Sequence, residues 1–531
     1  MRFIRYTPWL ATGIIGAALL PLYPWAGAAA LLLFALGLHD VVQRRHAVLR
    51  NYPLSGRLRF ALEYIRPEIR QYFLENDEEH VPFSRNQRAM VYQRAKGQND
   101  KRGFGSIKSM YEAGAEWLGH STAPTHVDPA SLRVTVGGPQ CTTPYHASIF
   151  NISAMSFGAL SPNAIRALNR GAKLGGFAHD TGEGSISRYH REHGGDIIWE
   201  IGSGYFGCRT PDGRFSEEKF AAQARDAQVK MVEIKLSQGA KPGHGGVLPA
   251  AKVSAEISAA RGVPMGEDCV SPASHSAFTT PAELMHFIAR LRTLADGKPI
   301  GFKLCIGHPW EWFAMAKAML DTGIAPDFIV VDGAEGGTGA APVELTDHVG
   351  MPLREGLRLV HNTLVGIGLR DRIRVGASGK IVSAFDIARA RALGADWCNS
   401  ARGFMFALGC IQSRSCHTDT CPTGVATQDT VRQRALVVGD KAERVRHFHE
   451  QTLASFAELL GAAGIARPEQ LTADHITVRD ADGRAVPLSR LVPTLAAGEL
   501  LHADAARLAT LPEPFRSYWA LATPSRFALA A

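Results

Sequence analysis

From residue 148 onward, short apolar runs alternate with longer stretches in which apolar residues recur every three to four positions. A short apolar run bounded by turn residues indicates a buried strand, whereas the longer period indicates an amphipathic helix. Several of the helical stretches end in glycine, which is typical of helix C-termini. The eight strands that this pattern predicts are residues 150–155, 177–181, 231–236, 268–271, 301–305, 328–332, 373–377 and 396–399.

Eight alternating strand–helix units predict an α/β fold, and specifically a (β/α)8 TIM barrel at residues 148–429. A doubly wound parallel sheet is the alternative that the same alternation allows. Residues 46–147 are polar with helical stretches and are predicted to form a helical cap or linker, and residues 430–531 are predicted to form a mainly helical extension. The active site of a barrel lies on the loops that follow the C-terminal ends of its strands.

Two almost entirely apolar runs, residues 6–20 and 26–38, precede the polar segment. Each is short for a membrane-spanning helix, which usually needs about 17–25 residues, but aromatic residues typical of membrane interfaces lie at their ends. Basic residues flank the pair on both sides, which places both flanks in the cytoplasm under the positive-inside rule. Residues 1–45 are therefore predicted to form a transmembrane helical hairpin in the inner (cytoplasmic) membrane, in contact with lipid, with the catalytic part facing the cytoplasm. The alternative is a cleaved signal peptide with Ala-Gly-Ala at residues 26–28 as its cleavage site.

Composition narrows the range of partners. The chain has 531 residues, 46% of them hydrophobic, and a formal net charge of +8. Its arginines are scattered, and no dense basic run with interleaved aromatic residues occurs, so nucleic acid is not expected as a partner. Eight cysteines are too few for a disulfide framework in so long a chain, and their clustering points to a reducing compartment and a ligand role.

The loop GCIQSRSCHTDTCPTG holds three cysteines, with five and then four residues between them: Cys410, Cys416 and Cys421. Thiolates are soft ligands, and one compact loop can present three of them to one face of a metal centre. Pro422 resembles the proline that follows the last cysteine of ferredoxin-type runs. Three thiolates without an obvious fourth suit a three-iron cluster. A zinc site with His417 as fourth ligand and three reduced cysteines without metal are the alternatives.

Polar and glycine-rich sequence follows most of the predicted strands. Glycine lets backbone N–H groups approach a ligand closely, adjacent N–H groups form anion-binding nests, and the loops after strands 7 and 8 of barrels often bind phosphate. A phosphate-bearing cofactor is therefore predicted there; the alternative is that the glycines only make tight turns. Lys235 and Lys303 lie on predicted strands, where a buried lysine requires an anion or another hydrogen-bond acceptor. Residues 202–207 match GxGxxG, but the turn-forming CRTPDGR follows them, so dinucleotide binding is not predicted.

Five motifs in series resemble those of one known family: ISAMSFGALS, HDTGEG, KLSQGAKPG, DGAEGGTGAAP and GCIQSRSCHTDTCPTGVATQ. Together they resemble the FMN-binding synthase domain of glutamate synthases, and still more closely the stand-alone bacterial proteins of that family. The resemblance covers about residues 148–429, in order and with the spacing of a barrel. The Cys-x5-Cys-x4-Cys-Pro loop is similar to the [3Fe-4S] loop of the family, which implies that Cys410, Cys416 and Cys421 hold such a cluster.

This resemblance implies that the barrel holds FMN and reduces 2-iminoglutarate, formed from 2-oxoglutarate and ammonia, to glutamate. By match of motif, Glu183, Lys235 and Lys241 are the implied catalytic residues, and Arg261 joins the two lysines in holding the carboxylates of the substrate. The residues implied around FMN are Met155, Ser156, Lys303, Gly336, Gly337, Ser378, Gly379, Ser400 and Arg402.

The sequence also departs from that of the large synthases of the family. It begins Met1-Arg2-Phe3, without the N-terminal cysteine nucleophile, and has His244-Gly-Gly-Val247 where they carry Glu and then Gln. We therefore expect ammonia that is free or supplied by a partner, a separate electron donor such as ferredoxin or a reductase subunit, and 2-oxoglutarate or a related small acid as substrate. The predicted enzyme is a glutamate synthase-like oxidoreductase acting on CH–NH2 donors. The alternatives are a membrane-associated FMN-dependent dehydrogenase of a small amino or hydroxy acid that feeds quinones, and a non-catalytic membrane redox sensor.

Overall fold

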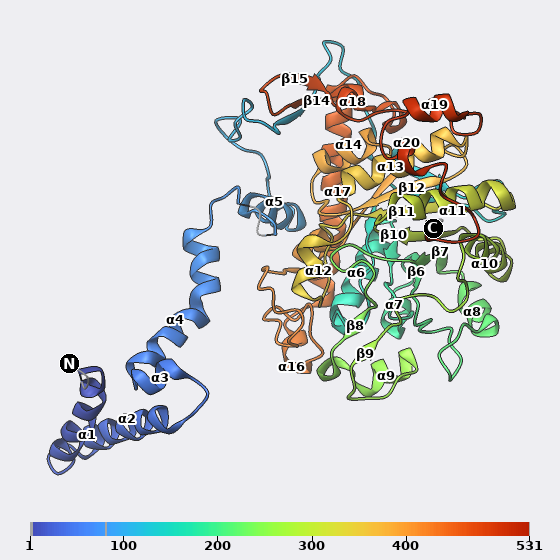
Figure 1. Cartoon of the computed structure of the whole chain (residues 1–531). Coiled ribbons are helices and arrows are strands. Elements are labelled where there is room, and N and C mark those ends of the chain that lie inside the picture. Colours follow the sequence, from blue (N-terminus) through green and yellow to red (C-terminus); the bar gives the residue numbers. More distant parts are fainter. Residues whose placement is uncertain (1–3, 80–81, 530–531) are drawn as a thin grey trace. The chain divides into compact units, whose positions relative to one another are not determined.

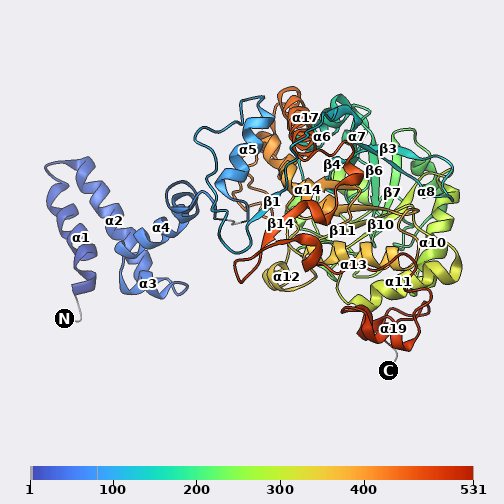
Figure 2. The same ribbon diagram turned by 90° about the horizontal axis from the view of Figure 1, so that it is seen from above.

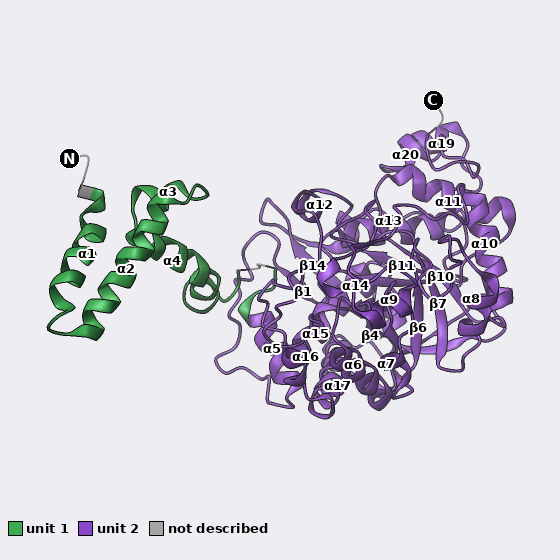
Figure 3. Cartoon of the chain, turned by 90° about the horizontal axis from the view of Figure 1, so that it is seen from below, with its two compact units in different colours: residues 1–85 green, residues 86–531 purple. Residues whose placement is uncertain are grey.

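Two compact units make up the chain, residues 1–85 and residues 86–531, which are coloured separately in Figure 3. The computed structural model describes residues 4–79 and 82–529. The larger unit contains the predicted barrel, and the smaller unit is made of helices.

A closed barrel of eight parallel strands forms the core of the larger unit (Figure 1). The strands are β4 (Phe150–Ile152), β5 (His179–Asp180), β6 (Ile197–Ile201), β7 (Val229–Lys235), β10 (Ile300–Leu304), β11 (Phe328–Asp332), β12 (Arg374–Ser378) and β13 (Trp397–Ser400). Each strand pairs with the next along the chain, and β13 closes onto β4, with Asn399 opposite Asn151. The prediction of an α/β barrel is therefore confirmed, and the doubly wound sheet is excluded.

Helices lie in the segments that connect the barrel strands and in the segment that follows the last of them. They are α6 (Pro162–Gly175), α7 (Arg188–Arg191), α8 (Glu217–Ala224), α9 (Ala255–Arg261), α10 (Pro281–Leu294), α11 (Pro309–Thr322), α12 (Val343–His348), α13 (Leu353–Gly366), α14 (Ala384–Ala392), α15 (Arg402–Leu408), α16 (Thr430–Arg434) and α17 (Val438–Ala462). Figure 2 shows α6 and α17 on one side of the strands and α11 and α13 on the opposite side. Their ends follow from local sequence: Thr280 and Glu283 form a capping box at the start of α10, and Gly323 ends α11 in the left-handed conformation that suits glycine.

One of the eight predicted strands is wrong, and another strand takes its place in the barrel. Residues 268–271 contribute only β9 (Cys269–Val270), which pairs antiparallel with β8 (Val247–Leu248) in a separate small sheet. The third barrel strand is instead β6, whose residues are all buried. The sequence IIWEI of β6 is an apolar run with one acid, and Glu200 is tolerated there because Lys303 forms an ion pair with it.

Further small sheets come from segments on both sides of the barrel strands. β2 (Arg133–Val136) pairs with β3 (Tyr145–Ser148), and β14 (Ile476–Arg479) pairs with both β1 (Glu116–Leu118) and β15 (Ala485–Pro487). Residues 46–147 thus contain strands as well as helices, which the polar pattern of that segment did not reveal. The other helices of the larger unit are α5 (Arg85–Ala95), α18 (Leu488–Leu491), α19 (Ala505–Thr510) and α20 (Phe515–Tyr518).

The smaller unit begins with two apolar helices, α1 (Thr7–Leu19) and α2 (Pro24–Val42), which pack against each other. The Trp9 ring stacks on Phe34 with centroids 5.2 Å apart, and Gly37 must be glycine because a β-carbon there would lie 2.1 Å from the Trp9 ring. Among the described helices, α2 alone has the length and mean hydropathy, 1.7, of a membrane span, and α1 is shorter. A helical hairpin is therefore present, and its crossing of a membrane stays a prediction. The helices α3 (Ala47–Asn51) and α4 (Ser55–Ile69) follow it.

Candidate active site

The residues implied by motif gather at the C-terminal end of the barrel. Lys235, Ser378 and Ser400 are the last residues of β7, β12 and β13, and Glu183 follows β5 by three residues. The Glu183 loop packs on the turn after β4, because a β-carbon on Gly182 would lie 2.7 Å from the backbone nitrogen of Ser156. The structure thus brings Met155, Ser156, Glu183 and Lys235 to one end of the barrel, where barrel enzymes carry their active sites.

Glu183 forms an ion pair with Lys235 at this end. The Nζ of Lys235 lies 2.9 Å from Oε1 of Glu183, and the Ser271 hydroxyl donates a hydrogen bond of 3.3 Å to Oε2. Two glycines close around the carboxylate: a β-carbon would lie 1.9 Å from Oε1 at Gly246 and 2.6 Å from Oε2 at Gly202. Any side chain at these two positions would therefore displace the carboxylate from Lys235.

Two more buried cations surround this pair. Lys241 donates a hydrogen bond of 3.0 Å from Nζ to the carbonyl of Ala340, which ties the loop after β7 to the loop after β11. Arg261, at the end of α9, donates from Nη2 to the carbonyl of Phe157 at 3.0 Å. The site therefore holds one carboxylate and three cations, which is a surplus of positive charge suited to an anionic ligand.

These charges determine the protonation of the site. Burial alone would raise the pKa of Glu183, but Lys235, Arg261 and Lys241 outweigh it and lower that pKa to about 2. Burial, and then the repulsion from Lys235, lowers the pKa of Lys241 to about 8. Without substrate, Glu183 is thus a carboxylate at neutral pH, and Lys241 is the group poised to give up a proton.

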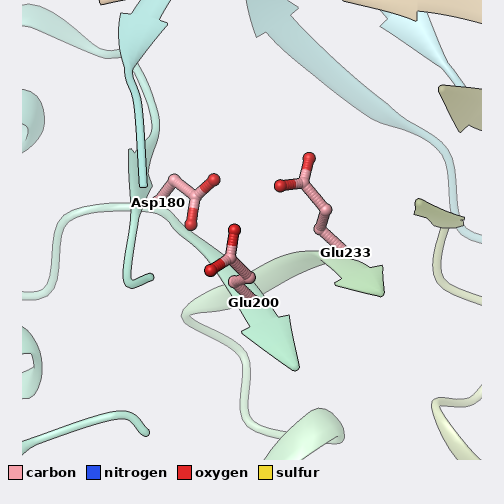
Figure 4. Close-up of side chains that lie close together, drawn as sticks. All are labelled: Asp180, Glu200 and Glu233. Atoms are coloured by element: carbon pink, nitrogen blue, oxygen red, sulfur yellow. The ribbon is translucent and has the colours of Figure 1, made fainter. Parts of the chain in front are cut away.

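Directly beside this site, Lys303 lies among buried carboxylates that the sequence analysis did not identify. It forms ion pairs with Glu200 and with Glu233, at 3.4 Å in the second case, and Figure 4 shows these two carboxylates close to that of Asp180. Carboxyl oxygens of the three acids lie within 4.8 Å of one another, a grouping that can hold a metal ion, but here the ammonium of Lys303 supplies the counter-charge. A glutamate inside each of two apolar runs, IIWEI and VKMVEIK, was the signal in the sequence.

The carboxylates and Lys303 shift one another's pKa values. Burial, and then the charge of Glu200, raises the pKa of Asp180 to about 7. Burial also raises the pKa of Glu233 well above its usual range, with Asp180 and Glu200 adding to the effect. Burial alone would lower the pKa of Lys303, but the surrounding carboxylates outweigh it and raise that pKa. One ammonium therefore faces three carboxylates that cannot all be ionised at neutral pH.

The phosphate site was predicted in the loops that follow β11, β12 and β13, which are called the cradle below. Gly337 lies so close to Arg402 that a β-carbon there would be 2.8 Å from Nε. Burial lowers the pKa of Arg402 to about 10, and it also lowers the pKa of Lys380, a residue that was not among the predicted FMN contacts. Two partly buried cations beside glycine backbone fit a phosphate dianion. The hydroxyl of Ser400 donates to the carbonyl of Ile381 at 2.6 Å, so this hydroxyl supports the loop.

The predicted metal ligands lie in the loop that follows α15. Burial raises the pKa of the Cys410 thiol to about 12 and also raises the pKa of Cys416. Burial alone would raise the pKa of Cys421, but the Thr423 hydroxyl and nearby backbone N–H groups outweigh it and lower that pKa. Among the described residues, the carboxylates of Asp180, Glu200 and Glu233 form a group whose ligand atoms all lie within 4.8 Å of one another. The sulfur atoms of the three cysteines do not all meet that distance. His417, the fourth ligand in the zinc alternative, is exposed.

Comparison with known proteins gives concordant matches. The family model described as a conserved region in glutamate synthase matches residues 135–466. The chain is 38% identical over 507 residues to the glutamate synthase large subunit-like protein YerD of Bacillus subtilis, covering 88% of this chain and 96% of that one. It is 36% identical over 329 residues to the archaeal glutamate synthase [NADPH] of Methanocaldococcus jannaschii, covering 62% and 61% of the two chains. The glutamate synthase [NADPH] large chain of B. subtilis matches 61% of this chain at 33% identity, and the match spans 21% of that protein.

Proposed function

Because this chain belongs to the glutamate synthase family, we propose that it is an FMN-dependent enzyme that reductively aminates 2-oxoglutarate, or a related keto acid, to glutamate. The observation that carries the proposal is the group of three buried cations, Lys235, Lys241 and Arg261, around the single carboxylate of Glu183. A dianionic keto acid would neutralise the surplus of positive charge, whereas a neutral or cationic substrate would leave it buried and unbalanced.

The protonation states of the site assign roles to its residues. Condensation of ammonia with the keto acid expels water and needs a proton at the carbonyl oxygen. Lys241 supplies that proton from Nζ, because its pKa of about 8 lies near neutral pH. Glu183 remains a carboxylate, accepts the N–H of the resulting iminium and holds Lys235 in place. Arg261 and Lys235 bind the carboxylates of the substrate. FMN, when bound and reduced by the separate electron donor, would supply the hydride for the iminium carbon.

The residues around the cradle fit FMN. Arg402 and Lys380, with Gly336, Gly337 and Gly379, would hold the phosphate, and Met155, Ser156 and Lys303 would border the isoalloxazine ring. The donor set is therefore cationic and rich in backbone N–H groups where the cofactor has its phosphate.

We propose a [3Fe-4S] cluster on Cys410, Cys416 and Cys421. One zinc ion with thiolates at about 2.3 Å would bring its sulfur ligands to within about 4 Å of one another. The three sulfur atoms do not all lie within 4.8 Å of one another, a spacing that does not fit a single zinc ion. The resemblance of the loop to the [3Fe-4S] loop of the family is what supports a three-iron cluster. The N–H groups and the hydroxyl around Cys421 stabilise a thiolate, which is the form that binds iron.

We further propose that the α1–α2 hairpin anchors the enzyme in the inner membrane, with the barrel in the cytoplasm. The hydropathy of α2 and the exposure of apolar residues such as Ile14, Trp25 and Leu32 support lipid as the surroundings of the hairpin. Electrons would come from a separate donor such as ferredoxin or a reductase subunit, and ammonia from solution or a partner.

The test is an assay of the full-length protein purified without oxygen, with flavin and iron quantified. We expect glutamate to form from 2-oxoglutarate only when ammonium and reduced ferredoxin, or reduced methyl viologen, are both present. No glutamate from a preparation with flavin and iron bound would overturn the synthase activity. Reduction of the flavin by a 2-hydroxy acid without ammonium would identify a dehydrogenase instead.

A further inference from the structure

We propose that Lys252 is a buried cation that joins the cysteine loop to the barrel and raises the reduction potential of the cluster held by that loop. This inference rests on the cluster proposed above. Lys252 ends the short 3-10 helix Ala250–Lys252 and is 2% exposed. No motif or resemblance in the sequence singles it out, because a lone lysine in LPAAKVS has the pattern of an ordinary surface residue.

The Nζ of Lys252 bridges two loops that are far apart in the sequence. It donates a hydrogen bond of 2.9 Å to the carbonyl of Ala426, just after the cysteine loop, and one of 3.2 Å to the carbonyl of Ala159, in the loop after β4. The loop after β4 also carries Met155 and Ser156, which border the proposed flavin site. Lys252 therefore lies where the cysteine loop meets the active-site loop.

Neutral contacts hold the same two loops together. Ser161 donates its backbone N–H to the carbonyl of Val425 at 2.9 Å. The side-chain amide of Gln428 donates to the carbonyls of Gly158 and Leu160 at 3.0 and 2.9 Å. Because these contacts already fix the geometry of the junction, a neutral donor at position 252 would be enough to complete it. A charged lysine there points to an electrostatic role.

The anions near Lys252 belong to the cysteine loop. Two carbonyl oxygens do not neutralise a buried ammonium, and burial lowers the pKa of Lys252. Asp419, Cys416 and Cys421 raise that pKa, so two of the proposed iron ligands are close enough for their charge to act on the ammonium. Reduction of a thiolate-bound cluster adds one negative charge, and a buried cation nearby stabilises the reduced state.

The experiment is an EPR-monitored redox titration of the full-length protein, purified without oxygen, for the wild type and three variants. Lys252→Gln removes the charge and keeps an amide that can donate to both carbonyls, and Lys252→Arg keeps the charge. Lys441→Gln is the matched control, because the Nζ of Lys441 would lie 3.7 Å from a β-carbon on Gly409 but forms an ion pair with Asp440 at 3.3 Å. We expect Lys252→Gln to weaken the reduction equilibrium at least about tenfold, which is about 59 mV for one electron. Lys252→Arg and Lys441→Gln should change it by less than about twofold, because the first keeps the charge and the second removes one that Asp440 already balances.

Each outcome decides between specific claims. A wild-type protein that contains flavin but no iron–sulfur signal contradicts the proposed cluster. A wild-type cluster with an unchanged potential in Lys252→Gln, or an equal shift in Lys441→Gln, overturns the role of Lys252 alone. Loss of iron in Lys252→Gln but not in Lys252→Arg supports the role, because the charge then holds the cluster. Loss of iron in both variants overturns it, because packing rather than charge is then what Lys252 provides.

Discussion

Lys235 and Lys303 are register partners on the neighbouring strands β7 and β10, yet their surroundings are opposite in charge. Lys235 is 8% exposed and shares its site with two more cations and the single carboxylate of Glu183. Lys303 is 4% exposed and faces three carboxylates as the central cation. Two lysines at the same height of one barrel therefore belong to one site with a surplus of positive charge and one site with a surplus of negative charge.

The surplus charge of each site is neutralised in a different way. A surplus of negative charge in a closed interior can be removed by binding protons, so the Lys303 site can be complete without any ligand. A surplus of positive charge on lysine and arginine is removed less readily, because arginine does not release its proton, and an anionic ligand is what balances it. The comparison therefore supports the proposed role of the Lys235 site in binding an anionic substrate. The charge of Lys303 is already balanced by its carboxylates, so its proposed place beside the isoalloxazine ring does not depend on an anionic ligand.

The largest expected effect is that of Glu183→Gln on catalysis. The substitution removes the one carboxylate that would accept the N–H of the iminium, and we expect kcat for glutamate formation to fall by roughly 10²–10³-fold. The KM for 2-oxoglutarate should not rise, since the cations that bind the substrate remain. Steady-state kinetics with 2-oxoglutarate and ammonium checks this.

The matched control is Asp327→Asn, which alters a buried carboxylate that forms an ion pair with Arg292 at 3.0 Å, outside the active site. This change should lower stability and leave kcat of the folded enzyme within about twofold, because Asp327 contacts none of the active-site residues. Equal losses of kcat in both variants would contradict a catalytic role for Glu183.

Next in size is the effect of Lys303→Met on stability. It leaves Glu200 and Glu233 buried without their cation, so the free energy of unfolding should fall by about 3–5 kcal/mol. Urea denaturation of preparations with matched flavin content measures the difference. The control Lys235→Met should cost less, because it also relieves repulsion with Lys241. If Lys235→Met lowers the free energy of unfolding more than Lys303→Met does, the expected difference between the two sites is wrong.

The sequence predicted the components of these sites better than their pairing. The motifs contain Glu183 and Lys235, Lys303 lies on a predicted strand, and the apolar alternation predicted the barrel and seven of its strands. The partners of Lys303 were not predicted, because its ion pairs join residues about 70 to 100 positions apart. The apolar pattern that identifies a strand also gives no information on which charged residues will meet. β6 was also missed and residues 268–271 were predicted in its place, because a short apolar run does not reveal which sheet it joins.

A smaller effect concerns the pH dependence of stability at Asp180. Its pKa is about 7 in the folded protein and 3.8 as the ordinary value, so the folded state binds the proton more tightly. This contribution to stability is complete below about pH 4 and is lost as the pH rises through 7, by an amount on the order of 4 kcal/mol. Asp180→Asn should flatten the stability profile between pH 4 and 7, as measured by urea denaturation at a series of pH values. An unchanged slope would mean that the carboxylates do not share a proton.

The smallest expected effect is the pH dependence of substrate capture through Lys241. Its pKa of about 8 in the free enzyme means that the ammonium is charged below pH 8 and loses its charge above it. Since the charge serves both the binding of the anionic substrate and proton donation, kcat/KM for 2-oxoglutarate should fall about tenfold between pH 7 and pH 9. Lys241→Arg keeps the charge at pH 9 and cannot donate a proton, so its kcat should be low while its KM no longer rises with pH. A profile of KM that still rises above pH 8 in this variant would assign the titration to another group and leave Lys241 outside the substrate site.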